Sequence, residues 1–207
     1  MGKRQAKAAP KATKPDPEAH QGIGDLPDQT PTTSAETLRS DIIFSALNSA
    51  TYHSMREMFF ARAYRIAAGI QALFATAAFA AIVKILPGIC AAWLALIVAV
   101  SAIFTLIWDP AGMAMRHNNL RRRFYEIYAR AEAASSIKKL EAIRHKMRLI
   151  YADEPPAYNA IKAMAWNTAI SATYPPEVAR KYLVPVSVGK RILANFWPFR
   201  SWDMQDA

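Results

Sequence analysis

The 207-residue sequence predicts an all-α membrane protein, in which a two-helix transmembrane hairpin carries a cytoplasmic helical bundle and follows a disordered N-terminal tail. Three observations predict this fold class. The stretch from Ile66 to Trp108 contains a single charged residue, whereas both flanking regions are densely charged. That stretch divides into two apolar runs of membrane-spanning length. No segment shows the alternation of apolar and polar residues that is typical of strands.

Residues 1–37 are predicted to be the disordered tail. They include five prolines and almost no large apolar side chains, so they cannot bury enough surface to offset the entropy lost on ordering. The first part of the tail is basic and the second part is acidic. Two roles fit this composition: a solubilising leader, or a tether to lipid head groups.

Residues 38–65 are predicted to form an N-terminal cytoplasmic helix that leads into the membrane. Ser40 or Asp41 can cap its first turn, because either side chain can accept a hydrogen bond from a free backbone N–H group. No proline or glycine interrupts the chain from there until Gly69. The apolar residues have spacings compatible with a helix: Ile43, Phe44, Leu47, Met55, Met58 and Phe59.

Residues 66–108 are predicted to be the transmembrane hairpin, with spans at 66–86 and 88–108. Each span has about the 20 residues that a helix needs to cross roughly 30 Å of hydrocarbon. Pro87 and Gly88 separate the helices, and so short a connection makes them antiparallel neighbours. The alternative is a long buried hairpin of a soluble protein, which the uninterrupted apolar length disfavours. Cys90 is the only cysteine and lies in an apolar run.

The distribution of arginine predicts the orientation of the hairpin. Arginines cluster before the first span and after the second, whereas the connection carries only Lys84. The positive-inside rule therefore places both termini in the cytoplasm. The same rule accounts for the formal charge of +10, for which nucleic-acid binding is the alternative explanation. Because the first apolar run begins near Ile66, we expect no secretory signal peptide, and the first span would act as the insertion signal.

Residues 109–207 are predicted to form a cytoplasmic helical region with two amphipathic helices at its start. The shared apolar face of the first comprises Leu120, Phe124, Ile127, Tyr128 and Ala131. The seam of the second comprises Leu140, Ile143, Met147 and Ile150. A third helix is expected at about 156–172, with Pro155 and Pro156 suited to its first turn. Segment 188–202 mixes aromatic rings with cations, which fits either a membrane interface or packing on the cytoplasmic helices.

The sequence contains no pattern that predicts catalysis or metal binding. None of its four histidines has a cysteine, histidine or carboxylate partner at metal-ligand spacing: His20, His53, His117 and His145. No glycine-rich phosphate-binding loop and no nucleophile elbow occurs. We therefore expect no enzyme, no cofactor and no metal site.

Small residues recur at helical spacing in both predicted spans. They are Ala68, Ala72, Thr76 and Ala80 in the first span, and Ala95, Ala99 and Ala102 in the second. Because small side chains let helix backbones approach closely, these faces are candidates for hairpin closure or for contact between subunits. The polar residues within the spans are Gln71, Ser101 and Thr105. They are candidates for lining a pore built from several subunits, and Gln71 alternatively makes an interfacial hydrogen bond.

A series of short motifs surrounds the hairpin between about Thr51 and Phe199. They are Tyr52-His53, Arg56-Glu57, Arg121-Arg122-Arg123-Phe124, Asp153-Glu154-Pro155-Pro156, Trp166-Asn167 and Tyr182-Leu183-Val184-Pro185. In this order the motifs resemble those of the SLATT domain, the SMODS and SLOG-associating two-transmembrane effector. Family members often have Cys or His beside the asparagine and Glu after it, whereas this chain has Trp166 and Thr168.

The resemblance implies a membrane effector of a prokaryotic conflict, or antiphage, system. Such a protein would reside in the cell inner membrane as a homo-oligomer. It would form a pore or perturb the membrane when a partner sensor or a nucleotide signal activates it. The chain shows no nucleotide-binding motif, so sensing would belong to a separate protein. The alternative, from a different class, is a non-conducting membrane-anchored scaffold whose cytoplasmic helices bind a partner.

Overall fold

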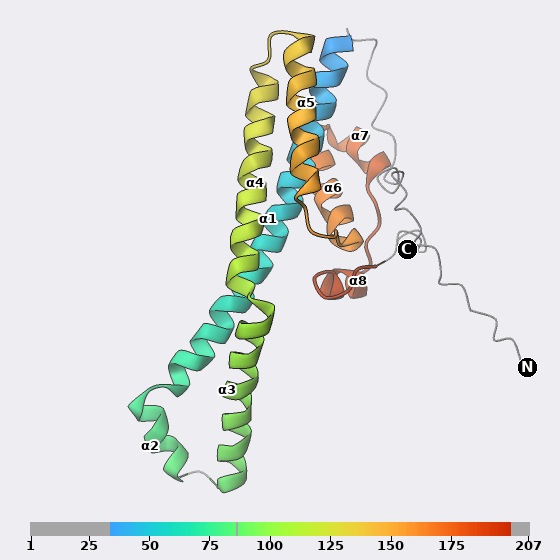
Figure 1. Ribbon diagram of the computed structural model, residues 1–207. Helices are drawn as coiled ribbons and strands as arrows, with labels where there is room; N and C mark the ends of the chain where they lie inside the picture. The colour runs from blue at the N-terminus through green and yellow to red at the C-terminus, as the bar shows by residue number, and fades with distance from the viewer. Residues whose placement is uncertain (1–33, 86, 200–207) are drawn as a thin grey trace, which may run out of the picture.

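The computed structural model describes residues 34–199 except residue 86, and every element in that range is helical. The predicted disorder of the tail falls on residues 1–33, outside the described range, and residues 34–37 already belong to a helix. Figure 1 shows a helical body at one end and two diverging apolar segments at the other. One long helix, α1 (Ser34–Phe74), belongs to both parts.

Helix α1 begins before the predicted caps. Ser40 lies inside the helix, where its hydroxyl donates back to the carbonyl of Glu36 at 3.0 Å. With 41 residues, α1 is about 60 Å long at 1.5 Å per residue. It therefore extends through the body and well into the apolar region.

The predicted first span, 66–86, is not a single straight helix. Helix α1 ends at Phe74, α2 (Ala77–Ile85) follows, and the two axes differ by 67°. Thr76 explains the break locally: its hydroxyl accepts from the backbone N–H of Phe79 at 3.2 Å and donates to the carbonyl of Leu73 at 2.9 Å. A threonine hydroxyl that accepts such a hydrogen bond caps the start of a new helix. This capping competes with continuation of the preceding helix through the same residue.

Helix α3 (Gly88–Trp108) has the bounds predicted for the second span, and it runs on into α4 (Pro110–Glu132). Asp109 joins them in the left-handed conformation, with φ at 39°, and its carboxylate accepts from Gly112 N at 3.0 Å. The combined run contains the one described helix that is long and apolar enough to cross a membrane by itself. Only 6% of its most apolar window is buried.

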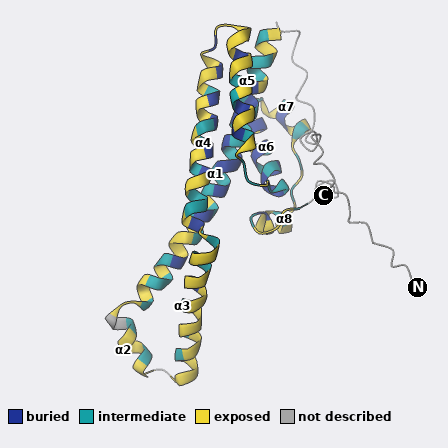
Figure 2. Cartoon of the chain, in the orientation of Figure 1, coloured by how far each residue is buried: buried dark blue, intermediate teal, exposed yellow. Residues whose placement is uncertain are grey.

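The body is built around the N-terminal half of α1. Helices α4 and α5 (Ile137–Ala152) pack on one side of it, and α6 (Asn159–Thr173) packs on another. Figure 2 shows the buried residues gathered in this body, whereas α2 and most of α3 are exposed. The predicted apolar face of α4 is its buried face, with only Tyr128 partly exposed. Three residues of the predicted seam of α5 are likewise buried, namely Leu140, Met147 and Ile150.

The remaining elements follow α6 in an irregular chain. They are α7 (Pro176–Ala179), the 3-10 turn η1 (Arg180–Tyr182) and α8 (Val188–Leu193). Pro155 and Pro156 were predicted to occupy the first turn of α6. They lie instead in the linker before it, because α6 begins at Asn159. This linker brings Asp153 and Glu154 alongside α4.

Candidate functional site

Two histidines meet in the neck, which we define as residues 52–60 of α1 and 108–124 at the end of α3 and the start of α4. The side chains of His53 and His117 are 0% and 1% exposed, and their Nδ1 atoms lie 2.9 Å apart. The prediction that no histidine has a partner at metal-ligand spacing concerned nearby positions in the sequence, and it does not address this contact between His53 of α1 and His117 of α4. Their positions are 64 residues apart in the chain, so no local spacing could show the contact.

Glu154 completes a three-residue chain of hydrogen-bonding groups. Its Oε1 lies 3.1 Å from His53 Nε2. One neutral assignment satisfies every N–H group: His53 Nε2 donates to Glu154, and His117 Nδ1 donates to His53 Nδ1. The Nε2 atom of His117 is then a bare acceptor, which agrees with its having no hydrogen-bond partner. The linker after α5 is thereby connected to both long helices.

Aromatic rings enclose the histidine pair. Phe124 stacks on His53 with a centroid distance of 5.6 Å, and Phe60 stacks on His117 at 5.7 Å. Burial, together with the smaller effects of the nearby His53, Arg56 and Arg116, lowers the pKa of His117 to about 3. His117 is therefore neutral at physiological pH, as the hydrogen-bonding assignment requires.

Arg56 lies one turn along α1 from His53 and is only 4% exposed. Its Nη1 donates to the carbonyl and the side-chain oxygen of Asn195 at 3.1 and 3.0 Å. Its guanidinium carbon lies 4.6 Å from the ring centroid of Phe60 and 4.2 Å from that of Tyr158. Burial lowers the pKa of this guanidinium. No carboxylate of the described residues pairs with it, so aromatic faces and an amide hold the cation.

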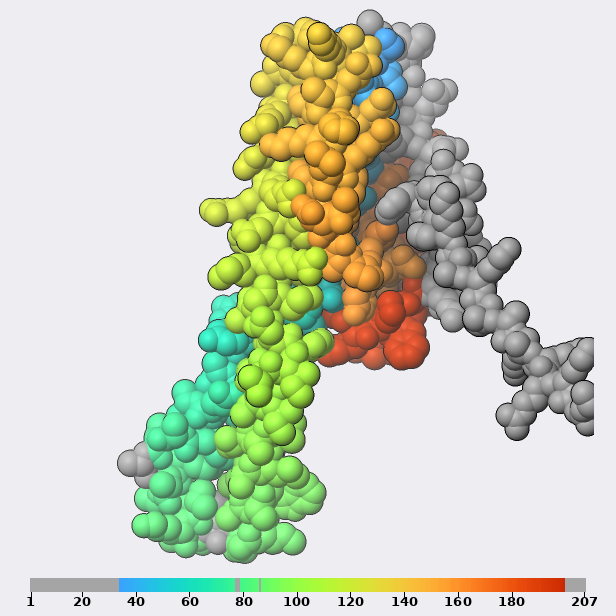
Figure 3. Space-filling model, viewed as in Figure 1, coloured from blue at the N-terminus to red at the C-terminus, as the bar shows by residue number. Residues whose placement is uncertain are grey.

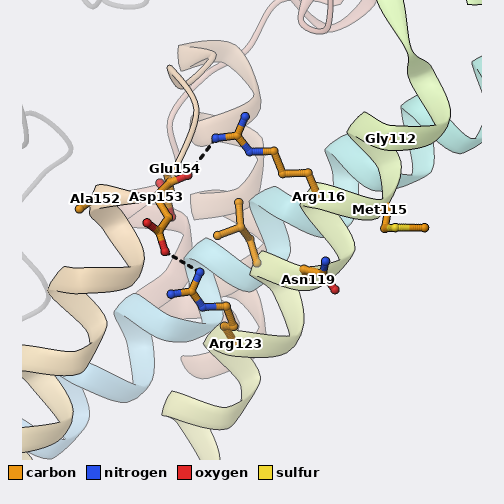
Figure 4. A pocket seen from close by; sticks show the side chains of 9 residues that line it. Gly112, Met115, Arg116, Asn119, Arg123, Ala152, Asp153 and Glu154 are labelled. Carbon is orange, nitrogen blue, oxygen red and sulfur yellow. Dashed lines mark hydrogen bonds and ion pairs between the residues drawn. The ribbon is translucent and has the colours of Figure 1, made fainter.

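A groove of about 680 Å³ lies on the outer side of the neck, between α4 and the α5–α6 linker. Figure 4 shows Arg116 and Arg123 reaching from α4 to Asp153 across it. Arg123 Nη1 pairs with Asp153 Oδ2 at 2.7 Å, and Arg116 Nη2 donates to the Asp153 carbonyl at 3.1 Å. Glu154 lines the groove as well, so the groove adjoins the buried histidine pair.

The other predicted motif residues have separate roles. Arg121 pairs with Glu57 at 2.9 Å, and Arg122 is exposed. Asn167 forms two hydrogen bonds to the backbone of Val184, donating at 2.7 Å and accepting at 2.8 Å. It therefore fixes the extended segment after η1, which is a structural role. Of the predicted motifs, Tyr52-His53, Arg56-Glu57 and residues 121–124 lie in the neck, and Asp153 and Glu154 contact it from the linker. Arg116, which was not among the predicted motif residues, joins them at the groove.

The predicted small-residue faces do not close the hairpin within one chain. Ala72, Thr76, Ala80, Ala95, Ala99 and Ala102 are exposed, and Ala68 is partly buried. Instead, Gln71 Nε2 donates to Thr105 Oγ1 at 3.3 Å, and Ser101 is buried between α1 and α3. Of the three polar residues expected to line a pore or to lie at an interface, Gln71 and Thr105 thus face each other in the single chain. Ser101 donates to the carbonyl of Val98 in its own helix at 2.9 Å.

The neck contains a hydrogen-bonded histidine pair and aromatic rings, but it contains no nucleophile paired with a base. Among residues 34–85 and 87–199, no group of three or more histidines, cysteines and carboxylates could hold a metal ion. The sequence does indicate the helix face on which each histidine lies, although it does not show that the two faces meet. His53, Arg56 and Phe60 recur at helical spacing on α1, and His117, Leu120 and Phe124 do so on α4. No protein-family model matches the chain, and no curated protein or solved structure matches it either.

Proposed function

We propose that the protein is a two-span inner-membrane effector that assembles into a homo-oligomer and then forms a pore or perturbs the bilayer. The single observation that carries this proposal is the almost complete exposure of α3, which continues directly into α4 of the packed body. An apolar helix exposed on nearly every side is stable in hydrocarbon and unstable in water.

The first span in this proposal consists of the end of α1 together with α2, bent at Thr76. The cap at Thr76 supports such a break within a span, because the hydroxyl satisfies a backbone N–H that the bend frees. The arginines on both sides of the hairpin favour cytoplasmic termini. The body would then lie in the cytoplasm, where an activating partner or nucleotide-dependent sensor could reach it.

Self-association is supported by the alanines on the outer side of α3. Ala95, Ala99 and Ala102 are exposed in the single chain and offer a surface on which a second backbone can approach closely. Two helices cannot enclose a pore, so conduction would require several subunits. The resemblance to the SLATT domain favours the same function, in which activation stops an infected cell.

Expression under a titratable promoter tests the proposal. We expect a rapid, dose-dependent loss of membrane potential, because higher concentration favours assembly. Ala99→Leu should reduce both depolarisation and the yield of crosslinked oligomer, whereas Val100→Leu, which adds bulk beside this face, should change neither. Unchanged potential at every dose, with the protein inserted, would contradict an autonomous effector.

The scaffold alternative retains one specific observation in its favour. The groove beside α4 presents arginines and Asp153 on the outer surface of the body, where a polar partner could dock. A scaffold predicts loss of partner binding when Arg116 and Arg123 are both changed to Gln, with no depolarisation by the parent protein at any dose. The effector predicts depolarisation by the parent protein.

A further inference from the structure

The segment 188–197, comprising α8 and the turn after it, exposes an apolar face that no described residue covers. Val188 and Ile192 are 72% and 69% exposed, and Trp197 is 63% exposed. Leu193 and Phe196 are also more than half exposed. Spacings of four, one, three and one place these side chains on one broad face, and Lys190 and Arg191 lie beside it.

The position of this segment is fixed at the end of the apolar helices. The ring of Phe196 packs edge-on against Phe59 at 5.2 Å and stacks on Trp108 at 6.3 Å. Trp108 is the last residue of α3. In Figures 1 and 3 the segment lies beside the junction of α3 and α4, at the level where α3 ends.

The opposite side of the segment is fastened to the body. Ala194 is fully buried in a cluster with Tyr52, Ala160 and Ile161. Asn195 receives both hydrogen bonds from the buried Arg56. These contacts orient the segment, so the outward direction of its apolar face follows from the packing of the body.

Two features of this face indicate what covers it: its continuity with the apolar surface of α3, and the cations beside it. Through Phe196 and Trp108 it joins the exposed apolar surface of α3, which the proposed function places in hydrocarbon. A segment at that level lies in the head-group layer, where Trp is enriched and Lys and Arg meet lipid phosphates. We propose that residues 188–197 are an in-plane membrane anchor that binds anionic phospholipid, with the apolar face in the interface and Lys190 and Arg191 on the head groups.

The proposal rests on the proposed function, and site-specific fluorescence separates the two. The full chain carrying Cys90→Ala and one new cysteine is labelled with a polarity-sensitive dye and reconstituted into vesicles. Trp197→Cys reports on the anchor, and Val100→Cys, at an exposed position outside the alanine face, reports on α3. Ala152→Cys, an exposed site on the body, is the control. Brominated lipid quenches a dye in the bilayer, and iodide quenches a dye in water.

We expect brominated lipid to quench the dye at position 197, and to do so more strongly when phosphatidylglycerol is mixed into phosphatidylcholine. Lys190→Gln with Arg191→Gln should remove most of this dependence, because each cation near an anionic surface contributes roughly fivefold to binding. Lys138→Gln with Arg148→Gln, an equal charge change at exposed sites on α5, should not.

Three results would overturn the anchor or its basis. Iodide quenching at 197, with lipid quenching at 100, would leave the segment in water although the hairpin is inserted. Protection at 197 from both quenchers would show that protein, such as a second copy of the chain, covers the face. Absence of lipid quenching at 100 would instead remove the membrane placement of α3, and with it the proposed function.

Discussion

Helices α3 and α4 form nearly one continuous rod, yet its two halves are built for different surroundings. In α3, Ser101 is the one buried residue, whereas α4 buries Pro110, His117, Leu120, Phe124, Ile127 and Ala131. The α4 half obtains its contacts from α1 and α5, and the α3 half leaves almost all of its apolar surface without a partner among residues 34–85 and 87–199. Substitutions in α4 should therefore act through the stability of the body, and those in α3 through lipid or another subunit.

The largest effect on this contrast is expected from Phe124→Ala. The ring is fully buried, stacks on His53 and packs against Tyr151 at 5.3 Å, so its removal should cost about 3–5 kcal/mol of stability. Denaturant unfolding of the detergent-solubilised chain measures this. Tyr125→Ala, at the exposed neighbouring position, should cost far less. If the protein is a gated effector, Phe124→Ala should still insert but should lose regulated depolarisation.

Equal losses of stability in Phe124→Ala and Tyr125→Ala would contradict the view that α4 is held by the packing of its buried face. They would mean that the core between α1, α4 and α5 does not hold the body together. Wild-type depolarisation by a normally inserted Phe124→Ala variant would show that this face does not couple the body to the hairpin.

Acidification should have the next largest effect. The pKa of His117 falls from 6.5 to about 3 in the folded chain, so the unfolded chain binds the extra proton between these values. Stability from this group is therefore complete above pH 6.5 and declines as the pH falls, by about 2 kcal/mol between pH 7 and pH 5. Thermal unfolding across this range should show the decline.

Two variants assign the acid sensitivity to the neck. His117→Phe removes the titrating group and should flatten this part of the pH profile, whatever its effect on absolute stability. His145→Gln, at an exposed position on α5, should leave the profile unchanged. A profile that keeps its slope in His117→Phe would refute the assignment.

A smaller effect is expected at the joint of the two halves. A Cβ atom on Gly112 would collide with the carboxylate of Asp109, which caps α4. Gly112→Ala should therefore displace the cap and cost about 1 kcal/mol. Gly189→Ala is the matched control, since no atom lies within 4 Å of the added Cβ. Stability equal to the parent in Gly112→Ala would show that the joint does not need this cap.

The smallest effect is expected inside the apolar region, from the bond between Gln71 and Thr105. A double-mutant cycle with Gln71→Ala and Thr105→Val should give a coupling of about 0.6 kcal/mol, the usual worth of such bonds in membranes. Unfolding in mixed detergent micelles supplies the measurement. A coupling of several kcal/mol would mean that α3 is held by its own chain as firmly as α4 is.

The sequence predicted the elements whose signal is local. An uninterrupted apolar run fixed the bounds of α3, and periodic leucine, isoleucine and phenylalanine identified the buried face of α4. The bend at Thr76 was missed, because a threonine continues a helix or caps a new one depending on the hydrogen bonds around it. The histidine pair was missed because His53 and His117 meet only after α1 and α4 pack. The location of residues 188–197 also depends on distant contacts.

Because α1 is unbroken from the neck to Phe74, a small tilt of the helix at the neck would move its far end by a much larger distance. From His53 to Phe74 the helix extends about 32 Å beyond the buried pair. A tilt of roughly 10° about that contact would swing the far end through about 5.5 Å, close to the pitch of one helical turn. A small change in the packing of the rings around His53 and His117 would thereby produce a displacement at Phe74 large enough to change which residues it contacts.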